Sequence, residues 1–367
     1  MIPPYRADHV GSLLRPRELL AARWRGAGTE ELAAIEDRYV LRLLAQQQML
    51  GLDVFTDGEL RRSNFMSNFT DAVEGLDLDG HVVARNWDAT KRDSKVPVSN
   101  VTGVVVSKLR QRRGLTSQEL PFLMQRAPGA FKVTLPSATQ FPAIAYKRGV
   151  SDAVYTSHSE LLWDIVAIVK SEIAALAAAG VPYIQIDAPR YSYYIDDKWR
   201  EWMRTEMGVD PEAALDEAIA ADNACFDAAR RDGVTLAIHL CRGNNRSHWY
   251  AEGGYDAIAE KLFASLHVDR FLLEYDDARS GTFEPLRFVP RGKFVALGLV
   301  TSKTPMLETQ ETLRARIEEA SRYVPLEHLA LSPQCGFAST MEGNILTEDQ
   351  QWAKLERVVQ TARSIWG

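Results

Sequence analysis

Cysteine is scarce in this sequence. Three occur in 367 residues: Cys225, Cys241 and Cys335. This small, odd number excludes a disulfide-stapled secreted domain and is typical of the reducing cytoplasm. No apolar run approaches the roughly 18 residues of a membrane helix. The amino-terminal MIPPYRADHVGS lacks the charged and apolar regions of a secretory signal. We therefore expect a cytoplasmic protein with no membrane partner.

Basic clusters are also few. The formal net charge is −6 and the pI is near 5.8, which disfavours nucleic acid as a partner. We interpret the pair Arg61-Arg62 as solvated surface. Glycine-rich nucleotide-binding motifs and the GxSxG motif of serine hydrolases are absent, so those classes are not expected. With 46% hydrophobic and 25% charged residues, the composition is that of a globular protein.

Short apolar segments alternate with helical patterns along the whole chain. Eight segments are predicted as strands, most of them apolar enough to be buried on both faces: residues 8–12, 53–59, 131–136, 182–187, 235–241, 270–275, 294–300 and 329–335. Helical periodicity is strongest between them, at residues 29–50, 158–179, 211–231, 306–323 and 347–365. This alternation predicts a (β/α)8 TIM barrel formed by a single domain, residues 1–367. An open α/β sheet would also place polar residues at its strand ends.

Residues 60–130 interrupt the alternation. They contain two β-rich stretches that predict a β-hairpin inserted after the second strand, followed by a helical segment near residues 117–126. Such an insertion would lie over the barrel mouth as a lid or a dimer contact. A homo-oligomer is therefore among the assemblies that the sequence allows.

Four residues at predicted strand ends have side chains of the types that commonly serve as metal ligands. His239 and Cys241 point to the same face of their strand, because alternate residues share a face. Glu274 ends the apolar run RFLLEY, and Cys335 follows another strand. Two thiolates, an imidazole and a carboxylate are a ligand set that suits tetrahedral Zn²⁺. The alternatives are buried cysteines that pack as small hydrophobes and a Glu274 salt bridge to an arginine. Cys225 lies in a helical pattern, and we interpret it as a residue that packs the helix against its neighbours.

Two further carboxylates, Glu59 and Asp187, end predicted strands. They can bind a substrate ammonium group or cap the helices that follow. The segment Val10-Gly11-Ser12 can offer backbone N–H groups to a substrate carboxylate or form a simple tight turn. Lys303 can neutralise an anionic group or extend to solvent.

These residues occur in motifs that resemble the catalytic domain of the cobalamin-independent methionine synthase family. The motifs are HVGS, DGE, IQIDAP, HLCRGN, FLLEYDD, SKTP and LSPQCGFAST, and they span nearly the whole chain. The resemblance implies a (β/α)8 barrel and a zinc ion held by His239, Cys241, Glu274 and Cys335. It also implies an amino-acid site, with the carboxylate held by Val10, Gly11 and Ser12 and the amino group held by Glu59 and Asp187.

The sequence departs from the full synthase in two places. Lys303-Thr304-Pro305 replaces a His-Ser-Pro segment whose histidine is implicated in leaving-group protonation. The stretch TLPSATQFP lacks a tryptophan platform for folate. These features are similar to those of the short, single-barrel members. The methyl donor is left open between a folate, a corrinoid protein and another compound.

The expected partners are a small-molecule thiol and this methyl donor. The sequence as a whole predicts a zinc-dependent methyltransferase in which homocysteine attacks the methyl donor as a zinc thiolate and forms methionine. Lys303 and Asp187 are the predicted catalytic residues. One alternative is a thiol alkyltransferase of the epoxyalkane:coenzyme M transferase type. The other is a non-catalytic, zinc-stabilised barrel, because four protein ligands are also typical of structural zinc.

Overall fold

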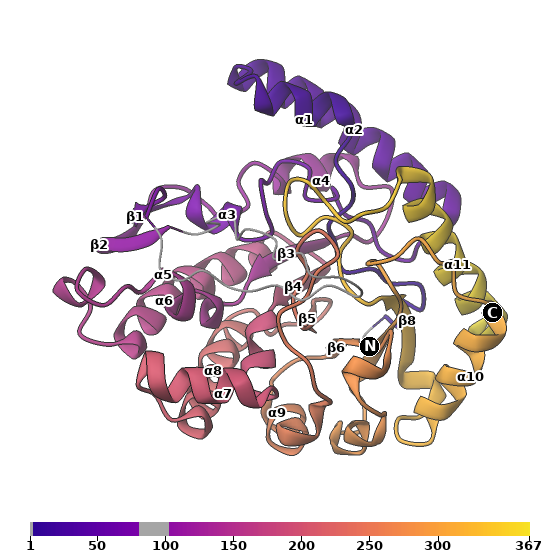
Figure 1. Cartoon of the computed structure of the whole chain (residues 1–367). Helices are drawn as coiled ribbons and strands as arrows, with labels where there is room; N and C mark the ends of the chain where they lie inside the picture. Colours follow the sequence, from indigo (N-terminus) through magenta and orange to yellow (C-terminus); the bar gives the residue numbers. More distant parts are fainter. Residues whose placement is uncertain (1–2, 81–102) are drawn as a thin grey trace.

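A computed structural model describes residues 3–80 and 103–367 of the chain. Its centre is a parallel six-stranded sheet in the order β3-β4-β5-β6-β7-β8, surrounded by helices (Figure 1). The strands are β3 Lys132–Pro136, β4 Tyr183–Asp187, β5 Thr235–Leu240, β6 Arg270–Glu274, β7 Phe294–Val300 and β8 Leu329–Pro333. Every residue in them is buried, which explains their near-continuous apolar sequences. Six of the eight predicted strands are thereby confirmed.

The predicted strands at residues 8–12 and 53–59 are not extended strands. The segment at residues 53–59 contributes one isolated parallel bridge, Phe55 to Phe131 beside β3. The other parallel bridge, Ala7 to Leu331 beside β8, lies just before residues 8–12. The prediction failed here because both segments turn early.

Glycine conformation accounts for these turns. Gly11 has φ +145° and Gly58 has φ +68°, followed by Glu59 at φ +56°. A positive φ turns the backbone away from the regular β conformation. The chain therefore leaves the sheet edge at HVGS and DGE and directs these loops over the ends of the strands.

The five strongest helical predictions are confirmed. They correspond to α2 Thr29–Leu50, α6 His158–Ala178, α8 Pro211–Asp227, α10 Gln310–Ser321 and α11 Glu348–Trp366. Helix α10 begins four residues later than predicted because the Thr309 side chain caps it, accepting a hydrogen bond from the Thr312 N–H. The remaining α-helices of the described residues are α1 Arg17–Trp24, α3 Ser67–Thr70, α4 Leu120–Arg126, α5 Pro142–Ala145, α7 Asp197–Trp202 and α9 Ala259–Ser265.

The region of the predicted insertion holds a two-stranded antiparallel sheet. Its strands are β1 Val73–Asp77 and β2 Val104–Gln111, and helix α4 follows them. The pair lies at the periphery, apart from the six-stranded sheet (Figure 1). The part of the predicted hairpin in residues 81–102 lies outside the described residues.

Two 3-10 segments follow the first strands of the sheet, η1 Ala138–Gln140 after β3 and η3 Pro189–Tyr194 after β4. The buried carboxylate of Asp222 in α8 holds both, because it accepts hydrogen bonds from Ser137 Oγ at 2.7 Å and from Tyr191 Oη at 2.9 Å. Within the described ranges, no helix is both long and apolar enough to cross a membrane.

Candidate metal centre

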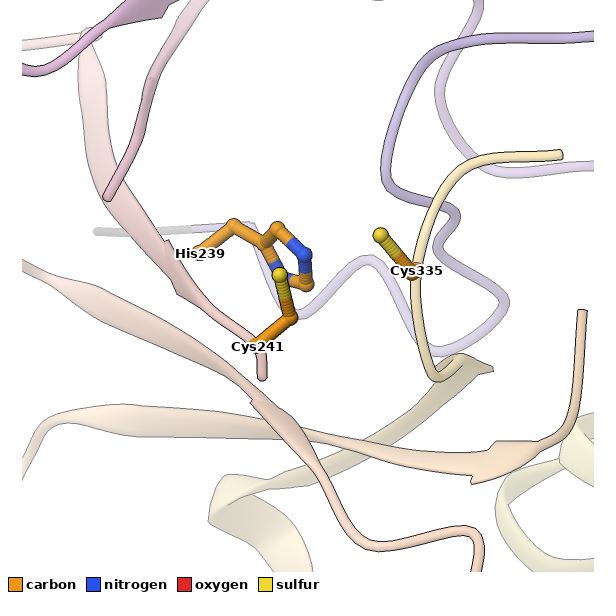
Figure 2. Close-up of side chains that lie close together, drawn as sticks. All are labelled: His239, Cys241 and Cys335. Atoms are coloured by element: carbon orange, nitrogen blue, oxygen red, sulfur yellow. The ribbon is translucent and has the colours of Figure 1, made fainter. Parts of the chain in front are cut away.

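The carboxyl ends of β5 and β8 bring three of the predicted metal ligands together. His239 lies in β5, Cys241 directly follows it, and Cys335 follows β8. The ligand atoms of these three buried residues all lie within 4.8 Å of one another. Figure 2 shows the imidazole and the two thiols facing a shared space, although Cys335 is distant from the other two in the sequence.

The hydrogen bonding of His239 leaves one ring nitrogen available as a ligand. Its Nδ1 lies 3.3 Å from the carbonyl oxygen of Leu272, and because a carbonyl can only accept, Nδ1 carries the proton. Its Nε2 is then an acceptor, and it is buried without a hydrogen-bond partner in the described structure. A backbone carbonyl that fixes the tautomer in this way is common behind metal-bound histidines.

The three groups shift one another's protonation. The pKa of Cys335 is well below its usual range, chiefly because of its interaction with Cys241 and also because His239 lies beside it. The pKa of Cys241 is raised well above its usual range by the same contact with Cys335 and by burial. Burial would lower the pKa of His239, but the neighbouring Cys335 raises it overall. Without a metal, the site therefore favours one thiolate beside one thiol.

Glu274, the fourth predicted ligand, is not part of this group among the described residues. Its Oε1 lies 2.6 Å from Nη2 of Arg279, and its Oε2 accepts a hydrogen bond of 2.9 Å from the Arg242 backbone N–H. Burial would raise its pKa, but Arg279, Lys303 and Arg242 together lower the pKa of Glu274 to about 2. The carboxylate is thus ionised and held by an arginine beside the three donors.

Lys303 is buried next to the centre rather than extended to solvent. Its Nζ donates to the carbonyl oxygen of Gly243 at 3.0 Å and lies 3.4 Å from Oδ1 of Asn244. Its positive charge contributes to the low pKa values of Cys335 and Glu274. Gly243 and Asn244 line the adjacent cavity, so the ammonium lies behind that loop.

The three donors line a cavity of about 810 Å³, including its open mouth. Four of the five predicted substrate-binding residues line the same cavity: Val10, Ser12, Glu59 and Asp187. Most of the predicted substrate-binding residues therefore share one cavity with the three donors.

The fifth residue, Gly11, lies directly behind Glu59. A Cβ at this position would be 3.0 Å from Cγ2 of Thr134 and 3.3 Å from Oε1 of Glu59. Together with its φ of +145°, this close approach explains why the position is a glycine.

Glu59 is fixed by a buried polar network that the sequence did not reveal. Its Oε1 accepts a hydrogen bond of 2.8 Å from Thr134 Oγ1 and lies 3.6 Å from Nη1 of Arg62. Arg62 in turn binds Glu119 through two hydrogen bonds of 2.6 Å. The interpretation of Arg61-Arg62 as solvated surface was therefore wrong: Arg62 is 2% exposed, and the Arg61 side chain is 8% exposed and pairs with Asp37. The Oε2 of Glu59 is buried and has no described hydrogen-bond partner.

Asp187 is the other carboxylate of the cavity. Its Oδ1 accepts a hydrogen bond of 2.7 Å from Gln185 Nε2. Burial raises the pKa of Asp187 to about 7, with His239 opposing this shift and Glu59 adding to it. Two buried carboxylates that face one cavity repel each other, and a cationic group between them would relieve this repulsion.

The residues present fit a zinc ion. A buried imidazole nitrogen without a partner, a stabilised thiolate and a second thiol are donors of the softness that zinc prefers. Because all three line a cavity, a further ligand has room to approach from the side of the substrate residues. Cys225, in contrast, is buried in α8 and packs against the core, as its helical pattern predicts.

Fold and site together define a class of protein: a parallel α/β sheet with a His-Cys-Cys donor group at the carboxyl ends of its strands. Residues 16–363 match the family described as the catalytic domain of cobalamin-independent synthase. The chain belongs to this family, the cobalamin-independent methionine synthases, as its motifs predict.

Relatives of known sequence or structure cover nearly the whole chain. An uncharacterised Bacillus subtilis protein, YxjH, is 40% identical over 369 residues, which are 99% of this chain and 95% of that protein. The methionine synthase of Saccharolobus solfataricus is 25% identical over 334 residues, 89% of this chain and 86% of its own. A crystal structure from Listeria monocytogenes, described as a candidate vitamin-B12-independent methionine synthase, has a TM-score of 0.73 at 28% identity and covers 100% of this chain and 99% of its own.

A second solved structure supports the fold alone. It is a B12-independent methionine synthase from Shewanella sp. W3-18-1 in complex with selenomethionine. The TM-score is 0.72 at 21% identity, over 99% of this chain and 98% of that one.

Proposed function

We propose that this protein is a zinc-dependent methyltransferase that transfers a methyl group to L-homocysteine and forms methionine. The observation that carries the proposal is one shared cavity, in which a buried His-Cys-Cys group and two acidic side chains lie together. A thiol amino acid has the two complementary ends, a sulfur for the metal and an ammonium group for the carboxylates.

His239, Cys241 and Cys335 would hold the zinc, and Glu274 is proposed as the fourth ligand in exchange for Arg279. When bound, zinc would lower the pKa of a substrate thiol and keep it nucleophilic near neutral pH. Lys303 would act electrostatically from behind the Gly243 loop.

The protein's own residues would orient the amino acid. Glu59, held by Thr134, and Asp187, held by Gln185, would accept hydrogen bonds from its ammonium group. The loop of Val10, Gly11 and Ser12 would hold its carboxylate. This placement would direct the sulfur to one side of the cavity and leave the other side for the methyl donor.

We further propose that the sheet closes into a (β/α)8 barrel formed by a single domain. The segments at Ala7 and Phe55 would serve as its first and second strands, since they pair with β8 and β3 respectively. A hydrogen bond of 3.3 Å from the Asp53 N–H to the Ala7 carbonyl oxygen joins them to each other. A closed barrel also explains why the site residues gather at one end.

Calorimetric titration of the zinc-loaded protein tests the function. L-Homocysteine should bind and release a proton, seen as a dependence of the heat on the ionisation enthalpy of the buffer. L-Homoserine, with a hydroxyl in place of the thiol, is the matched control and should release fewer protons, because it can displace only the proton held by Asp187, whose pKa is about 7, and has no thiol to ionise. Binding of coenzyme M but not homocysteine would contradict the proposal and favour an epoxide-opening thiol transferase.

A further inference from the structure

A second cavity lies beside the metal centre, separated from it by η1 and η3. Gln140 of η1 and Pro189 of η3 line the metal cavity, and their neighbours Thr139 and Arg190 line the second one. The second cavity has an empty volume of about 1200 Å³, including its open mouth. The wall between the two cavities is therefore formed in part by consecutive residues of two short segments.

Arg190 is the distinctive residue of this second cavity. It is 3% exposed, and its Nε, Nη1 and Nη2 have no hydrogen-bond acceptor in the described structure. Its guanidinium carbon lies 4.1 Å from the centroid of the Tyr193 ring and 5.9 Å from that of Tyr250. Ring faces stabilise a cation but leave its N–H donors unused. A buried guanidinium in this state has lost hydration that an anionic acceptor would replace.

The other charged groups of the cavity select the kind of anion. Arg148 and Asp152 lie on the exposed rim. The carboxylate of Glu217 accepts hydrogen bonds from the Ser159 hydroxyl and from Trp163 Nε1, the latter at 3.0 Å. Apart from Arg190, the cavity is thus lined by one arginine and two carboxylates, a combination that disfavours a dianion such as a phosphate monoester. One buried guanidinium suits a single carboxylate.

The remaining wall is largely aromatic and apolar. It includes Tyr146, Leu162, Tyr194, Met203 and Met207. The ring of His158 lies 4.3 Å from that of Tyr146, and burial and then Arg148 lower the pKa of His158, so this imidazole is neutral at pH 7. Such a wall fits an aromatic or other flat apolar body attached to the carboxylate.

We propose that the second cavity binds the carboxylate of the second substrate, an aromatic monocarboxylic acid or a compound that carries such a group, with Arg190 as its counter-ion. This inference rests on the proposed function in one respect, namely that the second substrate is the methyl donor. A donor anchored at Arg190 would extend its reactive end over η1 and η3 toward the metal cavity.

Benzoate and benzamide form a matched pair of probes, since they have the same shape and differ in charge. In calorimetric titration of the zinc-loaded wild-type chain, benzoate should bind at least about tenfold more tightly than benzamide. Arg190→Gln should abolish this preference, and Arg190→Lys should retain part of it. Arg148→Gln, on the exposed rim, is the control and should change the preference much less.

Equal binding of the two probes to the wild-type protein would overturn the proposal, as would unchanged benzoate binding by Arg190→Gln. If Arg190→Gln does not fold, the comparison of benzoate with benzamide in the wild type and in Arg190→Lys still tests the proposal. Titration of the same proteins with L-homocysteine separates the two proposals. If the wild-type protein did not bind homocysteine, the proposed function would be rejected. The proposal for the second cavity is tested separately, by the preference for benzoate over benzamide.

Discussion

Glu274 and Arg279 form a buried ion pair beside the candidate metal centre, with Oε1 and Nη2 separated by 2.6 Å. The carboxylate therefore has a partner other than the His-Cys-Cys group. A zinc ion that recruited Glu274 would have to compete with this arginine. In the proposed zinc site this competition would make Glu274 an exchangeable fourth ligand, which would suit the entry of a substrate thiol.

Removal of Arg279 is expected to strengthen zinc binding. Arg279→Gln removes a positive charge near the ion and releases Glu274, so zinc affinity should rise, because the arginine no longer repels the ion or competes for the carboxylate. The metal-free variant should lose about 3 kcal/mol of stability, because the buried Glu274 loses its ion-pair partner and keeps only the hydrogen bond from the Arg242 N–H. Competition with a chromogenic chelator and urea unfolding measure the two effects. Weaker zinc binding would instead mean that Arg279 positions Glu274 for the metal.

Loss of either thiol of the centre should remove the metal. Cys335→Ser or Cys241→Ser should lower zinc content by roughly tenfold or more, since a hydroxyl is a poor zinc ligand. Cys225→Ser is the matched control, because this third cysteine is buried in α8 away from the donor group. Elemental analysis after dialysis measures the zinc content of each variant. Full zinc in both site variants would reject the ligand assignment.

The ammonium role of Asp187 is testable without loss of the metal. Asp187→Asn should weaken homocysteine binding by about 1.5–3 kcal/mol, the usual size of a hydrogen bond to a charged group. Zinc content should not change. Asp152→Asn, an exposed carboxylate, controls for the overall charge. Calorimetry that finds the same homocysteine affinity in Asp187→Asn and the wild type would exclude this role.

Thr134 is expected to act as a positioning residue through Glu59. Thr134→Val removes the hydrogen bond of 2.8 Å to Glu59 Oε1 while it preserves the side-chain shape. Affinity for homocysteine should fall by roughly tenfold, with little change in zinc content. Thr134→Ser should restore affinity, because it keeps the hydroxyl. A purely structural role would leave homocysteine affinity unchanged in the valine variant, which should then show only a lower unfolding free energy.

Asp222 should make stability depend on pH. Burial raises its pKa from 3.8 to about 6, against the hydrogen bonds from Ser137 and Tyr191. A raised carboxyl pKa gives stability at low pH that is lost as pH rises through the folded-state value. The unfolding free energy of the wild type relative to Asp222→Asn should therefore fall by roughly 2–3 kcal/mol between about pH 4 and about pH 8.

Urea unfolding at several pH values measures this difference. Asp152→Asn is again the control for charge. If the difference between wild type and Asp222→Asn were the same throughout the pH range, Asp222 would not be the titrating group.

The sequence alone determined the local structure. The apolar runs predicted eight strands, six of which are confirmed, and the 3.6-residue period predicted the long helices, because both patterns follow from short-range burial and backbone geometry. The motif HLC placed His239 and Cys241 on one face for the same reason. The sequence could not show that the strands at HVGS and DGE would stop after a single bridge, since their glycines decide this through φ.

The tertiary structure alone decided which charged and polar side chains become partners. The sequence allowed a salt bridge from Glu274 to an arginine, but only the structure shows that Arg279 is the partner, because the loop after β6 folds back on itself. Arg62 looked like surface because charged pairs usually are, yet Glu119 and Glu59 compensate its burial. Thr134 is a hydroxyl-bearing residue within an otherwise largely apolar strand, and a buried polar contact could have been predicted from it. Arg190 gave no signal, because its isolation depends on what surrounds it, and only packing in three dimensions fixes the surroundings of a buried charge.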